Sequence, residues 1–136
     1  MSANKTLVKR FFDEIVNSRK SAVIDEIIHP EYINHGFPFP AKGPDAMRAI
    51  TEMIVGSFPD MKITVQKVIE DGATVATCGY WEGAHKGPFM NIPATGKTVK
   101  VEYVDVWDIK DGKLFENWVQ MDFVGLLQKI GAMPSN

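Results

Sequence analysis

The sequence predicts an α+β domain in which N-terminal helices pack on one face of a strongly curved antiparallel sheet. Apolar residues recur every three or four positions before Pro59, the period of amphipathic helices, and mostly every second position after it, the period of strands. Helices that precede a run of strands favour this fold class. A curved sheet closed on one side by helices forms a cone, and a cone too wide for side chains to fill leaves a pocket. We therefore expect the functional site inside the cone.

Three helices are expected before Pro59. The first covers Lys5–Val16, which carries a wide apolar face. The second follows Ser21 and ends at His29-Pro30, because proline disfavours helical geometry in the residue before it. The third begins near Pro44 and ends around Gly56. Between the second and third, Glu31–Lys42 is predicted to be an extended stretch followed by a loop.

Strands and a final helix fill the remainder. A phase slip at Lys67-Val68 predicts a bulge in the first strand, and Gly79 and Gly83 mark places where the second strand bends. Two Asp-Gly pairs predict tight hairpin turns. Asp122 is placed to cap the final helix. The predicted strands are Met61–Glu70, Ala73–His85, Lys97–Ile109 and Lys113–Met121, and the helix ends at Ile130.

Composition limits the partners. The chain has 136 residues, of which 45% are hydrophobic and 24% charged, which predicts one domain over residues 1–136. Fifteen basic and seventeen acidic residues give a net charge of -2, so we expect no nucleic-acid partner. Apolar runs are far shorter than the ~20 residues needed to span a bilayer. The N-terminal MSANKTLVKR lacks the apolar core of a signal peptide, so we expect a cytoplasmic location without a membrane partner.

Cofactor motifs are missing from the sequence. No serine stands in a nucleophile elbow, and no glycine pattern matches a dinucleotide or phosphate loop, so we expect no nucleotide cofactor. The three histidines, His29, His35 and His85, are too scattered for a metal set, so we expect no metal site. The single cysteine, Cys78, excludes an intrachain disulfide.

Asp105 is a carboxylate in an apolar setting. One face of its strand reads Val99, Val101, Tyr103, Asp105, Trp107 and Ile109. Burial of a carboxylate is costly and raises its pKa, which is how a general acid or base is adjusted towards neutral pH. The alternative is a structural carboxylate held by a lysine, an arginine or a backbone amide. We predict that Asp105 is catalytic and that Tyr103 and Trp107 contact the substrate.

Several further residues could reach the cone. If Phe115, Asn117, Val119 and Met121 share its inner face, Asn117 is their polar member and can orient a substrate carbonyl. Structural asparagines held by hydrogen bonds are the alternative. His35 can act as an acid or base near neutral pH and is predicted to be catalytic, although surface histidines are common. The predicted substrate contacts besides Asn117 are Tyr32, Asn34, His85, Val119 and Met90, the last as part of a pliable apolar lining, although methionines are also ordinary core residues.

Five short motifs stand in order along nearly the whole chain: His29-Pro30-Glu31-Tyr32, Phe58-Pro59-Asp60, His85-Lys86-Gly87 with Ile92-Pro93-Ala94-Thr95-Gly96, Asp111-Gly112-Lys113-Leu114, and Leu126-Leu127-Gln128-Lys129-Ile130-Gly131. Together they resemble the SnoaL-like polyketide cyclases of the nuclear-transport-factor-2-like fold, an α+β barrel. This resemblance implies an intramolecular aldol ring closure without cofactor or metal, in which an aspartate and a histidine manage proton transfer beside a carbonyl. It also implies a homodimer or higher oligomer.

The resemblance departs from the family pattern at the catalytic positions. The family's usual catalytic aspartate, just after the tryptophan in the strand Lys113–Met121, falls on Val119, which cannot move a proton. The histidine of the founding cyclase falls on Asp105. Asp122 is placed as a helix cap and is not promoted to the missing base.

Two hypotheses remain. The first is an enzyme that transfers protons on a small apolar, polyketide-like molecule, by cyclisation or isomerisation, with Asp105 as the base and His35, His85 or Asn117 assisting. The second is a non-catalytic binding or scaffold member of the same fold. We favour the enzyme, because an isolated carboxylate on an apolar strand is costly to keep without a use. A polar pair that converges in the cone favours catalysis, whereas a salt bridge to Asp105 favours binding.

Overall fold

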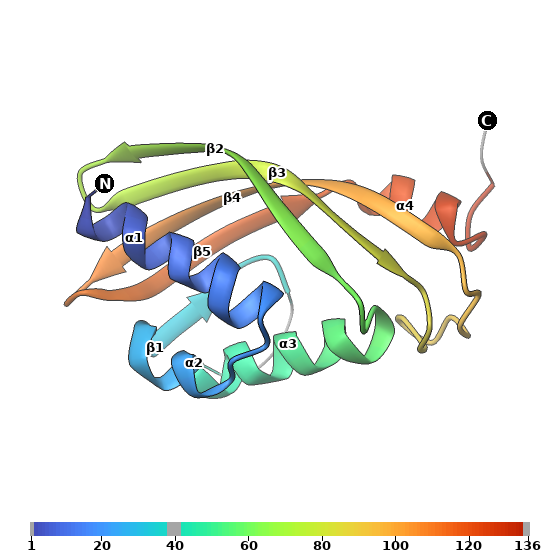
Figure 1. Cartoon of the computed structure of the whole chain (residues 1–136), viewed down its shortest axis with the longest axis horizontal. Helices are drawn as coiled ribbons and strands as arrows, with labels where there is room; N and C mark the ends of the chain where they lie inside the picture. Colours follow the sequence, from blue (N-terminus) through green and yellow to red (C-terminus); the bar gives the residue numbers. More distant parts are fainter. Residues whose placement is uncertain (1, 38–41, 135–136) are drawn as a thin grey trace.

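The computed structural model describes residues 2–37 and 42–134. Helices α1, α2 and α3 lie on the concave side of a long curved sheet, and α4 lies at its far end (Figure 1). The elements along the chain are α1 (Ala3–Arg10), the π-helix η1 (Phe11–Asn17), α2 (Ala22–Ile27), β1 (Ile28–Asn34), α3 (Pro44–Ser57), β2 (Lys62–Asp71), β3 (Thr74–Ala84), β4 (Thr98–Lys110), β5 (Lys113–Met121) and α4 (Phe123–Lys129).

The five strands have the order β1-β5-β4-β3-β2. The predicted α+β fold class is confirmed, with helices packed over a curved sheet. The sheet differs from the prediction in being mixed, because β1 pairs with β5 in parallel while the other pairs are antiparallel. Sequence analysis predicts an extended stretch from Glu31 onward. It does not predict that this stretch, as part of β1, pairs with β5 from the opposite end of the chain. Since β1 and β2 are both edges, the sheet remains open along one side.

Bends in β2 and β3 follow the predicted signals. The register of β2 slips between Val65 and Lys67, one residue before the predicted phase change, so Gln66 is the extra residue of a bulge. Opposite it, a Cβ on Gly79 would lie 1.9 Å from the carbonyl oxygen of Thr64, so the two strands approach closely only because residue 79 is glycine. The bulge and this glycine allow the sheet to curve over the helices.

Both predicted Asp-Gly turns are present, and the second is followed by an unpredicted shift. Asp111 and Gly112 have φ of 54° and 71°, as a two-residue hairpin requires. Close to this turn the β4–β5 register slips between Asp108 and Ile109, which pair with Glu116 and Leu114. Leu114 is therefore fully buried, while Phe115 packs against His29 near the surface. From Asn117 onward, alternate residues of β5 face the helices as predicted.

The first helix is longer than one regular α-helix. It is α-helical to Arg10 and continues as the π-helix η1, which turns Phe11 and Phe12 into the core. Short π-helical segments occur often at functional sites. The third helix begins at Pro44 as predicted, and Asp122 caps α4 by accepting a hydrogen bond from the Gly125 amide.

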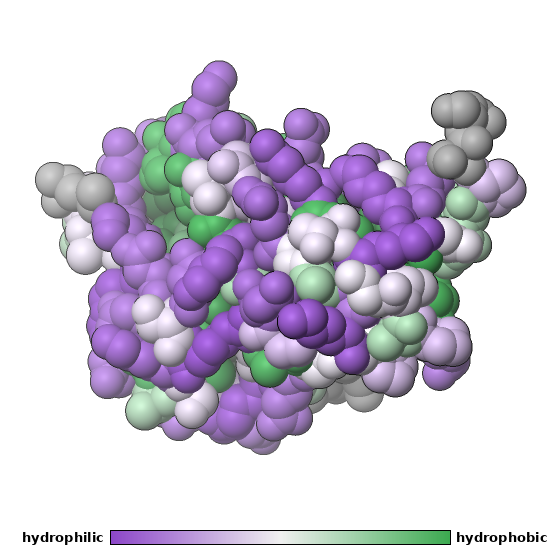
Figure 2. Space-filling model, turned by 45° about the vertical axis from the view of Figure 1, so that its right-hand side comes forward, coloured by the Kyte–Doolittle hydropathy of each residue, from purple (hydrophilic) through white to green (hydrophobic). Residues whose placement is uncertain are grey.

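The core lies between the helices and the concave face of the sheet. It comprises two clusters of buried residues, one around Trp107 and Tyr32 and the other around Phe58 and Trp81. Hydrophilic residues cover most of the face shown in Figure 2, and hydrophobic residues lie recessed between them. None of the helices within residues 2–37 and 42–134 is long and apolar enough to cross a membrane.

Candidate active site

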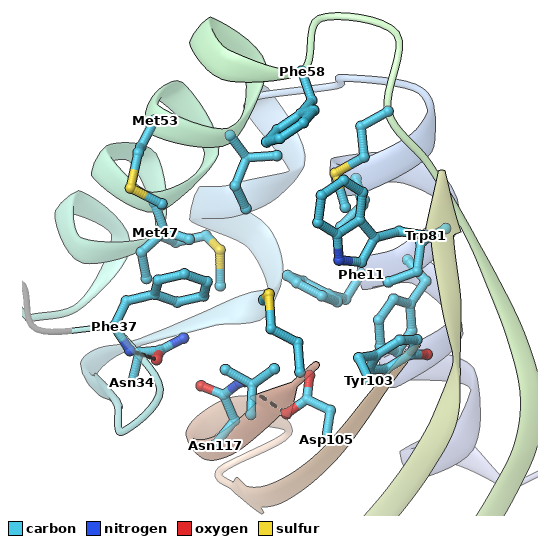
Figure 3. A pocket seen from close by; sticks show the side chains of 18 of the residues that line it. Phe11, Asn34, Phe37, Met47, Met53, Phe58, Trp81, Tyr103, Asp105 and Asn117 are labelled. Atoms are coloured by element: carbon cyan, nitrogen blue, oxygen red, sulfur yellow. Dashed lines mark hydrogen bonds between the residues drawn. The ribbon is translucent and has the colours of Figure 1, made fainter. Parts of the chain in front are cut away.

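A cavity of about 90 Å³ lies inside the curve of the sheet (Figure 3). Its walls come from η1, the end of β1, α3, the ends of β2 and β3, β4, β5 and α4, and they are largely apolar. Drug-sized ligands typically fill pockets of roughly 300–1,000 Å³, so a ring-bearing ligand requires wall side chains to move. Four flexible methionines make such movement easy, and they are Met47, Met53, Met61 and Met121.

Asp105 supplies the carboxylate of this apolar cavity. Its side chain projects from the concave face of β4 and the residue is only 3% exposed. Burial raises the pKa of Asp105 from 3.8 to about 7, although the Asn117 amide and the neighbouring Trp107 indole partly offset that rise. Among the described residues no lysine, arginine or histidine forms an ion pair with Asp105. The carboxyl group therefore changes charge near neutral pH.

Asn117 holds one oxygen of Asp105. The Asn117 Nδ2 donates a 2.9 Å hydrogen bond to Asp105 Oδ1, and this bond crosses from β5 to β4 (Figure 3). Asn117 is itself 2% exposed, so both side chains are withdrawn from bulk water. Within residues 2–37 and 42–134 no donor meets the second oxygen, Oδ2, with hydrogen-bond geometry, although the Trp107 indole is near enough to lower the pKa of the group. This oxygen can therefore take a proton or face a ligand.

A chain of hydrogen bonds extends from Asn117 to β1. The Tyr32 hydroxyl donates to Asn117 Oδ1 at 2.5 Å, and Asn34 Nδ2 donates to the Tyr32 oxygen at 2.9 Å. This chain exists because β1 runs parallel to β5, with Asn34 and Asn117 as register partners. Burial raises the pKa of Tyr32, so its hydroxyl keeps its proton and remains a donor.

The direction of the chain is fixed at its far end. Asn34 Oδ1 accepts from the backbone amides of Gly36 and Phe37, at 2.7 and 3.0 Å, so its Nδ2 must be the atom that faces Tyr32. Tyr32 then donates to Asn117, whose amide can only donate onward. Every donor therefore points towards Asp105, which stabilises its ionised form relative to the same site without the chain.

We expect Tyr32→Phe to weaken the stabilisation of ionised Asp105 by this chain of hydrogen bonds. The substitution keeps the ring stacked on Trp107, at 6.1 Å between centroids, but removes the hydroxyl that joins Asn34 to Asn117. The buried amide of Asn117 and the half-buried amide of Asn34 then lose a partner, so the free energy of unfolding should fall by about 1–3 kcal/mol. The pKa of Asp105 should rise, because Asn117 is no longer held as a donor. Denaturant unfolding and carboxyl-carbon NMR titration measure the two effects.

Tyr80→Phe is the matched control, because Tyr80 lies in β3 with Lys100 over its ring and makes no contact with this chain. If the pKa of Asp105 were the same in Tyr32→Phe and in the wild type, the chain of donors would not stabilise the ionised form of Asp105.

Only some of the site residues predicted from the sequence line the cavity. Asn34, Tyr103, Asp105, Asn117 and Val119 line it. Tyr32 is fully buried behind the cavity and acts through its hydroxyl, and Trp107 is a core residue packed against Phe11 and Tyr32.

His35 does not approach Asp105, although sequence analysis predicts both as catalytic. It lies at the end of β1 on the other side of the sheet edge, with its Nε2 2.5 Å from Glu116 Oε2 and its ring stacked on Trp118. Its side chain is 38% exposed. The reason is the alternation of a strand, because neighbouring Asn34 points into the cavity and the next residue must point away.

Met90 and His85 also lie off the cavity wall. Met90 is 62% exposed at a turn where its φ is 49°, so it does not form the predicted lining. His85 is fully buried, but it contacts Thr95 and packs beside Phe58, behind the wall. The glycine- and proline-rich sequence around Met90 signals a turn more strongly than a lining.

Sequence analysis does not identify the other wall residues that matter. Trp81 in β3, Phe37 after β1 and Met47 in α3 all line the cavity. The alternating pattern of β3 places Trp81 on the inner face, so that signal was present, whereas nothing in the sequence brings α3 opposite β4. Within residues 2–37 and 42–134, no group of three His, Cys, Asp or Glu residues is placed to hold a metal ion. Part of the predicted loop, residues 38–41, lies outside the described residues.

Comparison with known proteins gives a consistent family. Residues 6–130 match the profile described as SnoaL-like polyketide cyclase. The aklanonic acid methyl ester cyclase DnrD of Streptomyces peucetius is 28% identical over 96% of this chain and 92% of its own length. The nogalonic acid methyl ester cyclase of Streptomyces nogalater is 27% identical over 85% and 88%. The structure of TsrD from Streptomyces laurentii is 28% identical, covers 96% of both chains and has a TM-score of 0.86.

Proposed function

The chain belongs to the SnoaL-like polyketide cyclase family, and from this membership we propose that it catalyses a cofactor-free proton transfer on a small, apolar, polyketide-like ketone. The reaction class is an aldol-type ring closure or an isomerisation. The observation that carries the proposal is Asp105, a buried carboxyl group without an ion pair that faces an apolar cavity and has a pKa near neutrality.

The register of the sheet supports Asp105 as the base. Asp105 and Val119 are cross-strand partners in β4 and β5. The family resemblance places a histidine at the first position and the catalytic aspartate at the second. In this chain the carboxylate therefore stands one strand away from its usual position, in the same row of the inner face. A base at either position reaches the same cavity.

The chemistry requires only the transfer of one proton out and back. The Asp105 carboxylate takes a proton from a carbon next to a carbonyl, and the C–H electron pair forms the double bond of an enolate. The enolate carbon adds to a second carbonyl of the same molecule, and the new alkoxide takes the proton back from Asp105. The product has the mass of the substrate, and the apolar wall protects the enolate from protonation by water.

The alternative is a binding protein of the same fold, which the valine at position 119 favours. Asp105 is, however, held by an amide and not by a cation, and a neutral amide leaves its second oxygen free to exchange a proton. This difference supports the enzyme over the binding protein.

Turnover of the esters named for the relatives tests the proposal. The purified protein is incubated with aklanonic acid methyl ester or nogalonic acid methyl ester, without cofactor and with EDTA, and the products are separated by chromatography. We expect an isomer of unchanged mass that forms faster than in buffer. An ester that binds to the protein but is recovered unchanged would establish the binding protein instead.

We also propose that the protein is a homodimer joined through the outer face of the sheet. Register places Ile69, Ala76, Val106 and Trp118 in one row there, beside Val104, and Ile69 and Val104 are 64% and 53% exposed. Apolar patches of this kind are typical of interfaces. Sedimentation should give twice the chain mass for the wild type and the chain mass for Val104→Lys.

A further inference from the structure

Five buried polar atoms have no hydrogen-bond partner among the described residues. They are Thr77 Oγ1, Trp81 Nε1, His85 Nε2, Tyr103 Oη and Trp107 Nε1. A buried donor without an acceptor is unfavourable, because folding removes its bond to water and supplies nothing in return. Such an atom in the wall of a cavity is therefore a candidate contact for a ligand.

Four of the five atoms do not face the cavity. His85 and Trp107 are not part of its wall, and Thr77 lines a separate groove between α1 and β2. Tyr103 lines the cavity with its ring, but its hydroxyl is turned away towards β3 (Figure 3). Among the described residues this leaves the indole N–H of Trp81.

Trp81 is held firmly in this orientation. It projects from β3 between Ile63 of β2 and Val101 of β4, and it is 5% exposed. Phe58 packs edge-on against it, with ring centroids 4.9 Å apart and an angle of 67°. Figure 3 shows its indole nitrogen on the edge of the ring that faces the middle of the cavity, with Asp105 on another wall of the same space. Its neighbours are apolar, and the amide groups of Asn34 and Asn117, which also line the cavity, already donate within the hydrogen-bond chain to Asp105.

We propose that the Trp81 indole N–H binds the carbonyl oxygen of the ligand, and that the cavity is specific for ring ketones whose acidic C–H group faces Asp105. The cavity then offers an indole donor that has no partner among the described residues, and one carboxyl group, within a largely apolar wall. A ring with a carbonyl and an adjacent CH₂ is the smallest ligand that matches this pattern.

The same donor stabilises the enolate. When Asp105 takes the α proton, the C–H electron pair forms the C=C bond and the carbonyl π pair moves to the oxygen, where the indole N–H donates to it. Return of the proton to carbon restores the ketone. This step rests on the proposed function, whereas binding of the carbonyl by Trp81 does not.

The test uses 1-tetralone and tetralin, two ring compounds that differ in the carbonyl group. The indole resonances of ¹⁵N-labelled wild-type protein are assigned and followed during titration with each compound, and dissociation constants are measured for the wild type and Trp81→Phe. Trp118→Phe is the matched control, because Trp118 lies on the outer face and is 40% exposed. Exchange of the α protons of 1-tetralone in D₂O is followed in the same proteins and in Asp105→Asn.

We expect 1-tetralone, but not tetralin, to move the Trp81 indole proton downfield. The preference of the protein for the ketone over the hydrocarbon should fall about fivefold in Trp81→Phe, as expected for the loss of one neutral hydrogen bond, and should be unchanged in Trp118→Phe. Exchange of the α protons should slow about a hundredfold in Trp81→Phe. The indole shift is read in the wild type, so the test does not depend on how well the variant folds.

An unmoved Trp81 resonance in protein saturated with 1-tetralone would overturn the inference, as would an equal preference for the ketone in the wild type and Trp81→Phe. A shifted resonance without exchange in the wild type would support the ketone site and count against the proposed catalysis. The two proposals can thus fail separately.

Discussion

Asp105→Asn is expected to reduce turnover of the accepted ketone about a thousandfold. Asparagine has the shape of aspartate and still offers an oxygen to the Asn117 amide, which donates to Oδ1 at 2.9 Å. It cannot take a proton from carbon, and general acid–base groups typically contribute about 10²–10⁴-fold to a rate. The rate of ring closure, or of α-proton exchange in D₂O, measures the loss. The Michaelis constant should change little, because the cavity keeps its shape.

Asp108→Asn is the matched control for this substitution. Asp108 lies in the same strand, three residues along, on the opposite face, where Thr74 donates to it at 2.8 Å. The same chemical change there should leave turnover unaffected. Full activity of Asp105→Asn in a folded protein would remove Asp105 as the base and leave the binding protein as the better description.

The stability of the protein is expected to decrease as the pH rises from about 4 to 7, through the contribution of Asp105. The folded state raises the pKa of Asp105 from 3.8 to about 7, because burial disfavours its charge. Below pH 4 the group is protonated in both states. Between these values the unfolded chain releases the proton and the folded chain keeps it, so the unfolded state is favoured increasingly. Above pH 7 the full penalty, on the order of 4 kcal/mol, is reached and stays constant.

Comparison with Asp105→Asn isolates this contribution from the other carboxylates. Glu14, Glu31 and Asp60 have lowered pKa values, so their contributions are lost as the pH falls. They are the same in both proteins and cancel in the difference. The free energy of unfolding, measured in urea at several pH values, should show the variant gaining stability relative to the wild type up to about pH 7. A constant difference between pH 4 and 8 would mean that Asp105 titrates normally.

The same pKa predicts the pH dependence of the reaction. The base must be ionised to accept a proton, so the rate should rise with pH and level off above about 7 in the free enzyme. The loss of stability towards neutral pH and the ability of Asp105 to exchange a proton near neutral pH thus have one cause, the burial of its carboxyl group.

Local patterns in the sequence were sufficient for the elements and for Asp105. Alternation in β4 places Tyr103, Asp105 and Trp107 on the buried face, as predicted, because side chains of a strand point to opposite faces in turn. The Asp-Gly turns and the bulge in β2 also follow from local chemistry. The same alternation gave a wrong prediction for Phe115, which was expected on the inner face, because a register shift between two strands cannot be recognised in the sequence of either strand.

The contribution of β1 could not be derived from the sequence. Its pairing with β5 joins segments more than eighty residues apart, and the hydrogen bond from Tyr32 to Asn117 spans 85 positions. No periodicity within either segment specifies its partner or its direction. As a result the sequence suggested His35 as a catalytic residue and Tyr32 and Asn34 as substrate contacts, whereas the fold joins Tyr32 and Asn34 in a hydrogen-bond chain and turns His35 outward.

By itself the sequence determined that Asp105 is a buried carboxylate on an apolar strand, because burial and alternation are properties of a single segment. The tertiary structure alone decided which groups act on that carboxylate, namely the amide of Asn117 and the donor chain from Asn34 through Tyr32, and it placed the indole of Trp81 in the wall of the same cavity. The physical reason is that a pKa and a ligand contact depend on distances between atoms, and strands β1, β3 and β5 set those distances only when they assemble into one sheet.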